Sequence, residues 1–384
     1  MRGRRAVLRA LAGLGATPGL SPLPRLLGLA GAGALGIGTP LAALALPARP
    51  LPARPLPARA LRFPRDHGSH PDLRTEWWYI TGQLDAGDAQ FGFQVTFFRS
   101  RVDATQGMAS AFAARQLLFA HAAVTDVAAG RLWHDQRIAR AGFGIAQAAE
   151  DDTRIRLRDW SLARGADGAY AARTPAGDFS LDLRFTPTQP LLLQGREGLS
   201  RKGPQPSQAS YYYSQPQLQA QGQLQLKDRR LPVQGRAWLD HEWSEELLHP
   251  EAVGWDWIGM NLDDGSALTA FRLRRADGSA VWAGGSWREP GRPVRAFADT
   301  EVAFRPLRWW ASPASGTRYP VEWEVTTPAG RFTVQARADA QELDSRGSTG
   351  AIYWEGLSAL RDAAGRTVGH GYLEMTGYAQ PLRL

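Results

Sequence analysis

An internal repeat constrains this chain more than any other feature of its sequence. When residues 77–95 are placed on residues 255–273 without gaps, seven of 19 positions are identical, whereas chance gives about one. Later segments match in the same order, since Ala209–Tyr212 resembles Ala351–Trp354 and Trp238–Asp240 resembles Tyr372–Glu374. We therefore expect one duplicated unit, with a first copy over residues 62–245 and a second over residues 246–384.

Both copies show short aromatic and β-branched runs separated by Asp, Gly and Pro turns, the pattern of β-structure. Turns at Asp85–Ala89 and Ala276–Ser279 predict hairpins, because Gly and Asp tolerate positive φ. The clearest predicted strands are Thr75–Leu84, Phe91–Arg99, Ser266–Arg274, Val281–Trp287, Val321–Thr326 and Phe332–Ala338.

An antiparallel unit of this size must protect its edge strands, and a closed barrel does so without a helix layer. We therefore expect an all-β chain of two tandem lipocalin-like (calycin) antiparallel β-barrels. Such a barrel leaves room for one small ligand. A pair of β-sandwiches is the alternative architecture.

The first 61 residues differ from the rest. Residues 1–45 combine Arg4-Arg5, an apolar run and a small-residue end at Ala43–Ala45, the order of an export signal, and the arginine pair resembles a twin-arginine signal. We expect an exported, periplasmic or secreted protein, and an uncleaved membrane anchor is the alternative. Residues 46–61 repeat Leu-Pro-Ala-Arg, which predicts an extended linker.

Charge and cysteine content exclude several functions. The net charge of +8 comes from eight arginines within residues 1–60, and the remaining chain carries 37 basic and 37 acidic residues. Nucleic acid is therefore not an expected partner, because phosphate binding needs clustered cations on the folded surface. The chain has no cysteine, which excludes disulfides, a thiol nucleophile and cysteine metal ligands.

The segment from Trp238 to Trp243 is the richest in chemical groups. In a strand, His241 and Trp243 share one face, and Asp240 and Glu242 share the other. A histidine beside a tryptophan inside a barrel suits proton transfer to an apolar substrate. The alternative is a core histidine with two surface acids near the junction of the two copies.

Asp256 lies between Trp255 and Trp257 at the start of the second copy. Alternation places it opposite both tryptophans, where a lone acid inside a barrel could protonate a double bond or orient water. In the alternative, Asp256 faces solvent and the tryptophans fill the second core.

His67 and His70, with Asp72 and Glu76 nearby, mix metal-ligand types with turn residues. We favour a role for His70 and Glu76 at the pocket mouth over a metal site.

Tyr211, Tyr212 and Tyr213 cannot all face one way in a strand, so at least one hydroxyl should face the interior or the pocket. The polar stretch before them, residues 194–208, is interpreted as a lid or as an exposed linker.

Several motifs together resemble the AttH-like family of predicted secreted hydrolases, relatives of carotenoid 1,2-hydratase. The resemblance covers residue 66 to the C-terminus. Its motifs are His70-Pro71-Asp72, Thr75–Gly82, Phe91–Gln94, Phe97–Arg99, Phe119–His121, Tyr212–Ser214, Asp240–Trp243, Tyr353–Gly356, Gly371–Glu374 and Thr376–Tyr378.

The resemblance implies a tandem lipocalin fold and a pocket for a hydrophobic, isoprenoid or lipid-like substrate. It implies cofactor-free addition of water to a double bond and points to His241, Trp243 and Asp256 as catalytic candidates. Glu242 is a second catalytic candidate, next to His241 in the chain. His70, Glu76, Trp78, His121, Tyr212 and Tyr213 are the matching substrate-binding candidates. Gly254 stands where the hydratase pattern has a tyrosine two residues before the aspartate.

The expected function is a hydratase or hydrolase of a hydrophobic small molecule, with His241 as general acid/base and no cofactor or metal. We expect the site in the first copy and at its junction with the second. A non-catalytic carrier of lipid or isoprenoid is the alternative, and a structural or assembly factor is a third hypothesis. Peripheral association with a membrane is a further expectation. No serine nucleophile elbow, phosphate loop, His-Glu-x-x-His or dinucleotide motif is present.

Overall fold

The computed structural model describes residues 55–246 and 248–382, and within these ranges the regular structure is β-sheet with three short 3₁₀ turns. These turns are η1 (Arg65–His67), η2 (Asp103–Thr105) and η3 (Asp299–Glu301). The predicted export signal (1–45) and the linker up to residue 54 lie outside the described residues. No helix in the described part of the chain has the length and hydropathy to cross a bilayer.

Thirteen strands form the first antiparallel sheet, in the order β4-β3-β2-β1-β13-β12-β9-β8-β7-β6-β5 with β10 and β11 on β12. Strand β6 contacts β3 and β4, so the two ends of this sheet approach each other as in a barrel. The strands are β1 (Thr75–Ala86), β2 (Ala89–Arg101), β3 (Gln116–Asp126), β4 (Arg131–Arg140), β5 (Ala146–Ala148), β6 (Arg154–Leu157), β7 (Trp160–Arg164), β8 (Tyr170–Pro175), β9 (Phe179–Thr186), β10 (Leu192–Leu193), β11 (Leu199–Arg201), β12 (Ala209–Leu226) and β13 (Arg229–Glu246).

Ten strands form the second antiparallel sheet, in the order β17-β16-β15-β14-β23-β22-β20-β19-β18 with β21 on β22. The strands are β14 (Gly254–Leu262), β15 (Ala267–Arg274), β16 (Ala280–Arg288), β17 (Arg295–Phe297), β18 (Ala303–Ala311), β19 (Arg318–Thr327), β20 (Gly330–Ala336), β21 (Glu342–Asp344), β22 (Ile352–Arg361) and β23 (Thr367–Met375). The predicted all-β fold with two antiparallel units is confirmed.

The sequence repeat appears as a repeated strand arrangement. The neighbours β12-β13-β1-β2 of the first sheet correspond to β22-β23-β14-β15 of the second. The register is also repeated, because Tyr79 pairs with Asp240 and the matching Trp257 pairs with Glu374. Each predicted strand overlaps one of these elements, although β15 begins at Ala267, one residue after the predicted start, and β20 ends at Ala336, two residues before the predicted end.

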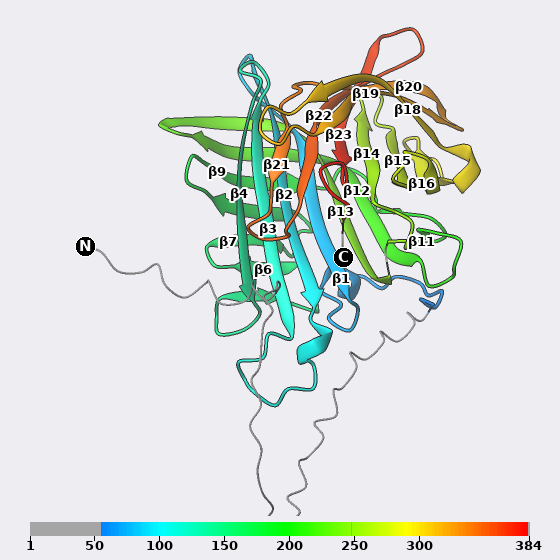
Figure 1. Cartoon of the computed structure of the whole chain (residues 1–384). Helices are drawn as coiled ribbons and strands as arrows, with labels where there is room; N and C mark the ends of the chain where they lie inside the picture. Colours follow the sequence, from blue (N-terminus) through cyan, green and yellow to red (C-terminus); the bar gives the residue numbers. More distant parts are fainter. Residues whose placement is uncertain (1–54, 247, 383–384) are drawn as a thin grey trace, which may run out of the picture. The chain divides into compact units, whose positions relative to one another are not determined.

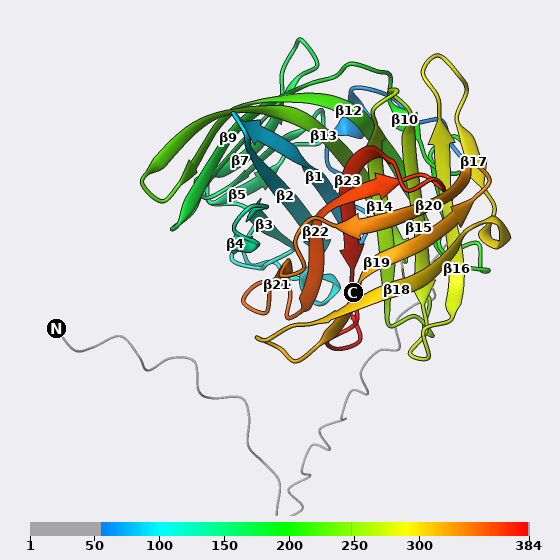
Figure 2. The same cartoon turned by 90° about the horizontal axis from the view of Figure 1, so that it is seen from above.

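Each sheet surrounds its own apolar core, and a third apolar cluster lies between them. Trp78 and Phe93 belong to the first core, Ile258 and Trp323 to the second. The cluster between the sheets includes Tyr79, Trp238, Trp257, Leu357 and Tyr372. Figure 2 shows β23 beside β1, and β14 beside β13, where the sheets meet.

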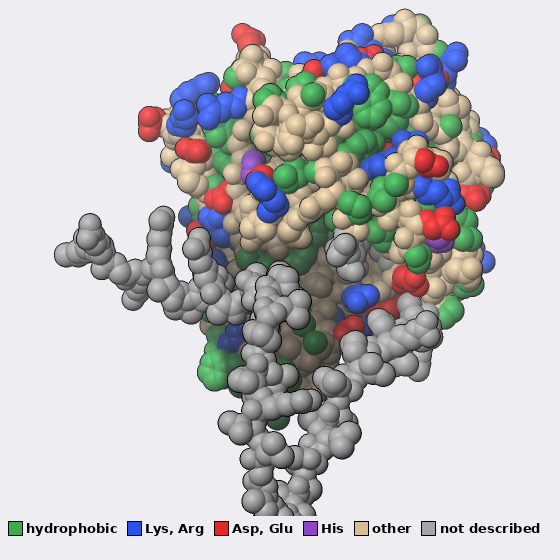
Figure 3. Space-filling model, in the orientation of Figure 1, with side chains coloured by type: hydrophobic (Ala, Val, Ile, Leu, Met, Phe, Trp, Pro, Cys, Tyr) green, Lys and Arg blue, Asp and Glu red, His purple; other side chains and the backbone are tan. Residues whose placement is uncertain are grey.

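Basic and acidic side chains are both scattered over the face drawn in Figure 3. This face shows no single-sign field of the kind that phosphate binding would need.

The stretch predicted as a lid or exposed linker is tied to the first sheet. Leu199–Arg201, within this stretch, and Leu192–Leu193, just before it, both pair with β12. Residues 192–201 therefore extend the sheet over the segment that carries the three tyrosines.

Candidate active site

Strand β13 divides the functional candidates between two opposite faces. His241 pairs with Trp78 and Asp240 with Tyr79 across the β1–β13 ladder. Asp240 and Glu242 line a cavity between the two sheets, whereas Trp243 belongs to the core of the first sheet. The predicted alternation along this strand is confirmed.

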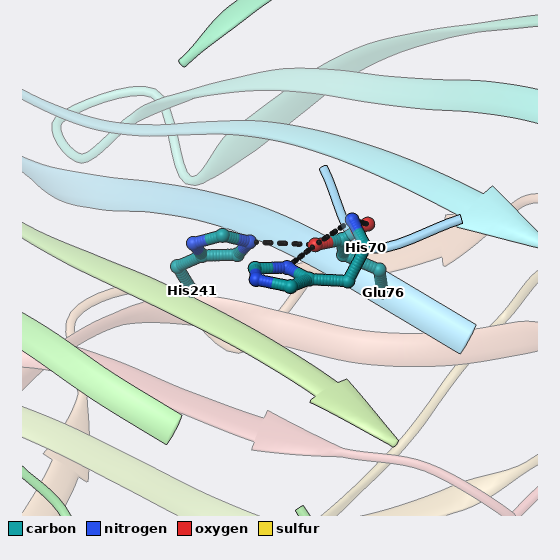
Figure 4. A group of neighbouring side chains, drawn as sticks. All are labelled: His70, Glu76 and His241. Atoms are coloured by element: carbon teal, nitrogen blue, oxygen red, sulfur yellow. Dashed lines mark hydrogen bonds and ion pairs between the residues drawn. The ribbon is translucent and has the colours of Figure 1, made fainter. Parts of the chain in front are cut away.

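Inside the first sheet, His70, Glu76 and His241 form a buried cluster (Figure 4). The Nδ1 atom of His70 lies 2.7 Å from Oε1 of Glu76, and Nε2 of His241 lies 3.0 Å from the same oxygen. A carboxylate only accepts hydrogen bonds, so Nε2 of His241 carries the proton. Its Nδ1 atom is hydrogen-bonded to the Tyr213 hydroxyl at 3.2 Å.

Glu76 is the centre of this network. Its second oxygen accepts hydrogen bonds from Ser69 Oγ at 2.9 Å and Arg99 Nε at 2.8 Å. Burial opposes ionisation, but the hydrogen bonds from His241 and His70 and the charge of Arg99 hold the pKa of Glu76 well below its usual range. Glu76 is therefore a charged acceptor enclosed by donors.

His241 is enclosed as well. Its ring is fully buried and stacks on Trp78 with centroids 4.6 Å apart, and it lies 4.6 Å from the ring of Trp243. Burial lowers the pKa of His241 to about 4, against the opposing effect of Glu76. His241 therefore remains neutral at physiological pH.

The cluster has one property of a metal site. Ligand atoms of His70, Glu76 and His241 all lie within 4.8 Å of one another. Each already has a partner, since His70 Nε2 lies 2.9 Å from an oxygen of Asp66 and Glu76 is held by Arg99. His67, the other histidine of the sequence motif, is instead hydrogen-bonded to Tyr213 at 2.8 Å. The contacts are those of a complete hydrogen-bond network.

The outer face of the same strands lines a cavity of about 320 Å³ between the sheets. This volume lies at the lower end of the range for small-molecule sites. Its apolar lining comes from both sheets: Trp77, Phe98, Leu117, Phe119, Ile138, Trp255, Trp257, Phe271, Leu273 and Ile352.

Asp240 is a deeply buried acid of this cavity. Its oxygens accept hydrogen bonds from Tyr212 at 2.6 Å, Ser214 at 2.6 Å and the Trp238 indole at 2.7 Å. Burial raises the pKa of Asp240 to about 7, although these three donors favour its charged form. Both protonation states are therefore populated near neutral pH.

Glu374, on β23, is half-buried and lines the same cavity. Burial and the neighbouring carboxyls of Asp240 and Glu242 raise the pKa of Glu374 to about 7. Glu355, on β22, accepts a hydrogen bond from Gln94 at 2.7 Å. Burial and the charge of Glu374 raise the pKa of Glu355 well above its usual range, so this third acid stays protonated.

Glu242 differs from the other acids because it has a cationic partner. Lys202 Nζ lies 2.9 Å from Oε1 of Glu242, and Ser210 donates to the same oxygen. The ammonium also lies 4.1 Å from the centroid of the Phe271 ring. Glu242 is therefore committed to an ion pair in the cavity wall.

His121 reaches the cavity from β3. Its Nδ1 is hydrogen-bonded to the Tyr353 hydroxyl at 2.8 Å and its Nε2 to Ser348 Oγ at 2.9 Å. Burial lowers the pKa of His121 to about 3. A neutral His121 thus links the first sheet to the second without adding charge.

Asp256 lies outside both groups. Its Oδ2 accepts a hydrogen bond from Arg272 Nε at 2.7 Å, and its Oδ1 accepts one from Tyr378 at 2.8 Å. Arg274 lies 3.6 Å away. Asp256 is buried but not a lone acid, and it faces neither solvent nor the cavity between the sheets.

The sequence candidates therefore fall into three places, and their assigned roles stay predictions. The cavity is lined by Glu242, His121 and Tyr212, and also by Glu76. The cluster inside the first sheet holds His70, Glu76, Trp78, His241, Trp243 and Tyr213. Asp256 is paired with arginines in the second sheet.

Sequence reasoning assigned no role to Glu355, Glu374 or Asp240, and it placed Asp240 at the surface only in its alternative interpretation. The repeat carried a usable signal, because Trp238–Asp240 matches Tyr372–Glu374. Two acids at equivalent positions, next to aromatic residues, indicate a feature shared by both copies. Gln94 and Lys202, which hold two of the acids, had no such signal.

Comparison with known families identifies the chain. The model of the AttH-like family matches residues 54–378. The chain belongs to the AttH-like family. No functionally curated protein matches this chain.

Two solved structures are similar to this AttH-like chain. An AttH protein of Nitrosomonas europaea is 47% identical, with a TM-score of 0.79 over 85% of this chain and 99% of that one. Kievitone hydratase of Nectria haematococca is 12% identical, with a TM-score of 0.65 over 86% of this chain and 98% of that one. The second similarity shows a shared, lipocalin-like fold alone.

Proposed function

We propose that this AttH-like protein is a hydratase that adds water to a carbon–carbon double bond of a hydrophobic, isoprenoid or lipid-like substrate in the cavity between the sheets. The observation that carries the proposal is the pair of acids, Asp240 and Glu374, in a cavity whose wall also contains several aromatic rings. The fold is also that of a protein named as a hydratase, kievitone hydratase.

Glu374 is the proposed general acid. It is the less enclosed of the two, and a carboxyl with a pKa of about 7 is half protonated at neutral pH. Transfer of its proton to one alkene carbon leaves a carbocation at the other. Aromatic rings such as Trp257 and Trp77 can stabilise that charge, because a ring face attracts a cation.

Asp240 is the proposed general base. Its three donors hold the carboxylate in one orientation, with Tyr212 between it and the Trp257 indole, which donates to the Tyr212 hydroxyl at 3.2 Å. Water adds to the carbocation and loses a proton to Asp240. Return of that proton to Glu374 completes the cycle, so the net change is the addition of one water.

The test follows product formation from a panel of isoprenoid alkenes in heavy-oxygen water by mass spectrometry. We expect a gain of one labelled water with the wild type and a loss of at least about 100-fold in rate with Glu374→Gln or Asp240→Asn. Glu301→Gln, at an exposed position, is the matched control and should react as the wild type does. Two fragments, one of which carries the heavy oxygen, in place of one adduct would indicate hydrolysis.

His241→Gln tests the competing sequence hypothesis in the same assay. We expect this variant to lose stability but to keep most of its activity per folded molecule. Wild-type rates in both acid variants, with loss of activity only in His241→Gln, would contradict the proposal. Alkene bound unchanged by all the proteins would make the chain a carrier.

A further inference from the structure

Large exposed apolar side chains are unevenly distributed over the described residues. Eight such side chains occur in the described ranges: Phe63, Met108, Phe112, Ile138, Phe143, Ile145, Leu307 and Trp309. Five of them, Met108, Phe112, Ile138, Phe143 and Ile145, come from residues 102–115 and 138–145, which join or flank the β3–β4 pair. We call these five residues, with Arg115 and Arg140, the β3–β4 patch.

The patch is assembled by contacts between its two segments. The rings of Phe112 and Phe143 stack with centroids 5.4 Å apart, although the two residues are 73% and 56% exposed. The Arg140 guanidinium lies 4.1 Å from the Phe143 centroid and 5.4 Å from that of Phe112. Arg115 donates a hydrogen bond to the Met108 carbonyl at 2.7 Å. Two phenyl rings are thus held together in solvent by a cation.

The two charged side chains of the patch are both basic. The two segments of the patch, residues 102–115 and 138–145, carry Arg115 and Arg140 and one acid, Asp103, which is paired with Arg101. Exposed aromatic rings interleaved with arginines are the pattern of surfaces that insert into the headgroup region of an anionic bilayer.

The patch is continuous with the cavity between the sheets. Ile138, one of its exposed members, also lines the cavity. Leu117, another lining residue, is paired with Arg140 across the β3–β4 ladder. The patch therefore shares Ile138 with the wall of the proposed site.

We propose that the β3–β4 patch docks this protein on an anionic lipid bilayer, so that an apolar substrate passes from the membrane into the cavity without crossing water. The docking follows from the exposed rings and arginines alone. The delivery of substrate rests on the proposed function.

The absence of cysteine allows a site-specific test in the full chain. Phe112→Cys receives an environment-sensitive fluorophore, and Leu307→Cys, 41% exposed on β18 in the wild type, receives the same label as a control. With vesicles of phosphatidylglycerol and phosphatidylcholine, we expect about a two-fold or larger rise in emission at position 112, with a blue shift, and quenching by chain-labelled lipid. Salt and neutral vesicles should weaken the signal.

A second arm measures vesicle co-sedimentation. We expect Phe112→Ser/Phe143→Ser to lower the partition coefficient about ten-fold or more, while Leu307→Ser/Trp309→Ser leaves it unchanged. Three outcomes would each overturn the docking. The emission at position 112 could stay unchanged on addition of vesicles, or it could change equally at positions 112 and 307. It could also rise without vesicles as the protein concentration increases. The assay contains no substrate, so a negative result leaves the pocket chemistry standing. Glu374→Gln should dock normally even if the proposed chemistry fails.

Discussion

Replacing Asp240 with asparagine removes a carboxyl that the fold holds in a low-dielectric site while leaving an oxygen for its donors. In the wild type this carboxyl is 3% exposed and accepts from Tyr212, Ser214 and Trp238. Burial raises its pKa from the ordinary value of 3.8 to about 7. The folded protein therefore binds a proton at Asp240 that the unfolded chain has already lost.

The sign and size of the effect follow from this difference. A group whose pKa is raised by folding destabilises the fold as the pH increases from the unfolded pKa to the folded one. Between pH 5 and pH 8, Asp240 should therefore cost the wild type roughly 2–3 kcal/mol of unfolding free energy, at about 1.4 kcal/mol per pKa unit. The substituted asparagine amide does not titrate, so Asp240→Asn should gain that amount relative to the wild type over the same interval.

The measurement is chemical denaturation followed by tryptophan fluorescence, for wild type and Asp240→Asn at pH 5 and pH 8. Comparing the two proteins at each pH cancels the titration of all other acids. Asp228→Asn, at an exposed turn position between β12 and β13, is the matched control. Its unfolding free energy should differ from that of the wild type by the same amount at pH 5 and pH 8. The critical quantity is the difference in unfolding free energy between Asp240→Asn and the wild type. If this difference is the same at pH 5 and pH 8, the fold does not hold the carboxyl neutral and the acid/base assignment loses its basis.

Three further perturbations test other parts of the structure. Glu76→Ala should lower the unfolding free energy by about 3–5 kcal/mol in thermal or chemical denaturation, because Arg99 loses its buried partner; a cost below about 1 kcal/mol would contradict the charged network. Gly259→Ala would place a Cβ in steric overlap with the Trp257 ring, so it should cost about 1–3 kcal/mol and alter turnover, and unchanged values would mean that the ring can move freely. A metal chelator should change neither the thermal midpoint nor turnover, since the ligand-type atoms around Glu76 already have partners, and a loss restored by a divalent ion would refute this.

The fold was largely predictable because local signals and the repeat agree. Hairpin turns such as Asp85–Ala89 and alternating runs such as Thr75–Leu84 report backbone geometry directly. The division of β13 into a face with His241 and a face with Asp240 also follows from period-two alternation. It needs no knowledge of the rest of the chain.

The site was less predictable because burial is a tertiary property. Asp240 has the same local pattern whether its face meets water or a second sheet, and only the docking of β23 beside β1 decides which. The same holds for Asp256, whose partners Arg272 and Arg274 come from the neighbouring strand. The sequence pointed to His241 because a histidine side chain can transfer protons. In the structure, its surroundings make it a fixed hydrogen-bond donor to Glu76.

The repeated register has a consequence for how a ligand is oriented. Each copy contributes the equivalent strand, β1 or β14, to the cavity, so a fully symmetric duplication would offer two equal binding orientations. The copies differ where they meet the ligand: Tyr79 faces Trp257, and the fully enclosed Asp240 is matched by the more accessible Glu374. In the proposed mechanism these mismatches, rather than the identities that reveal the repeat, would distinguish the acid from the base and so give the reaction a direction in space.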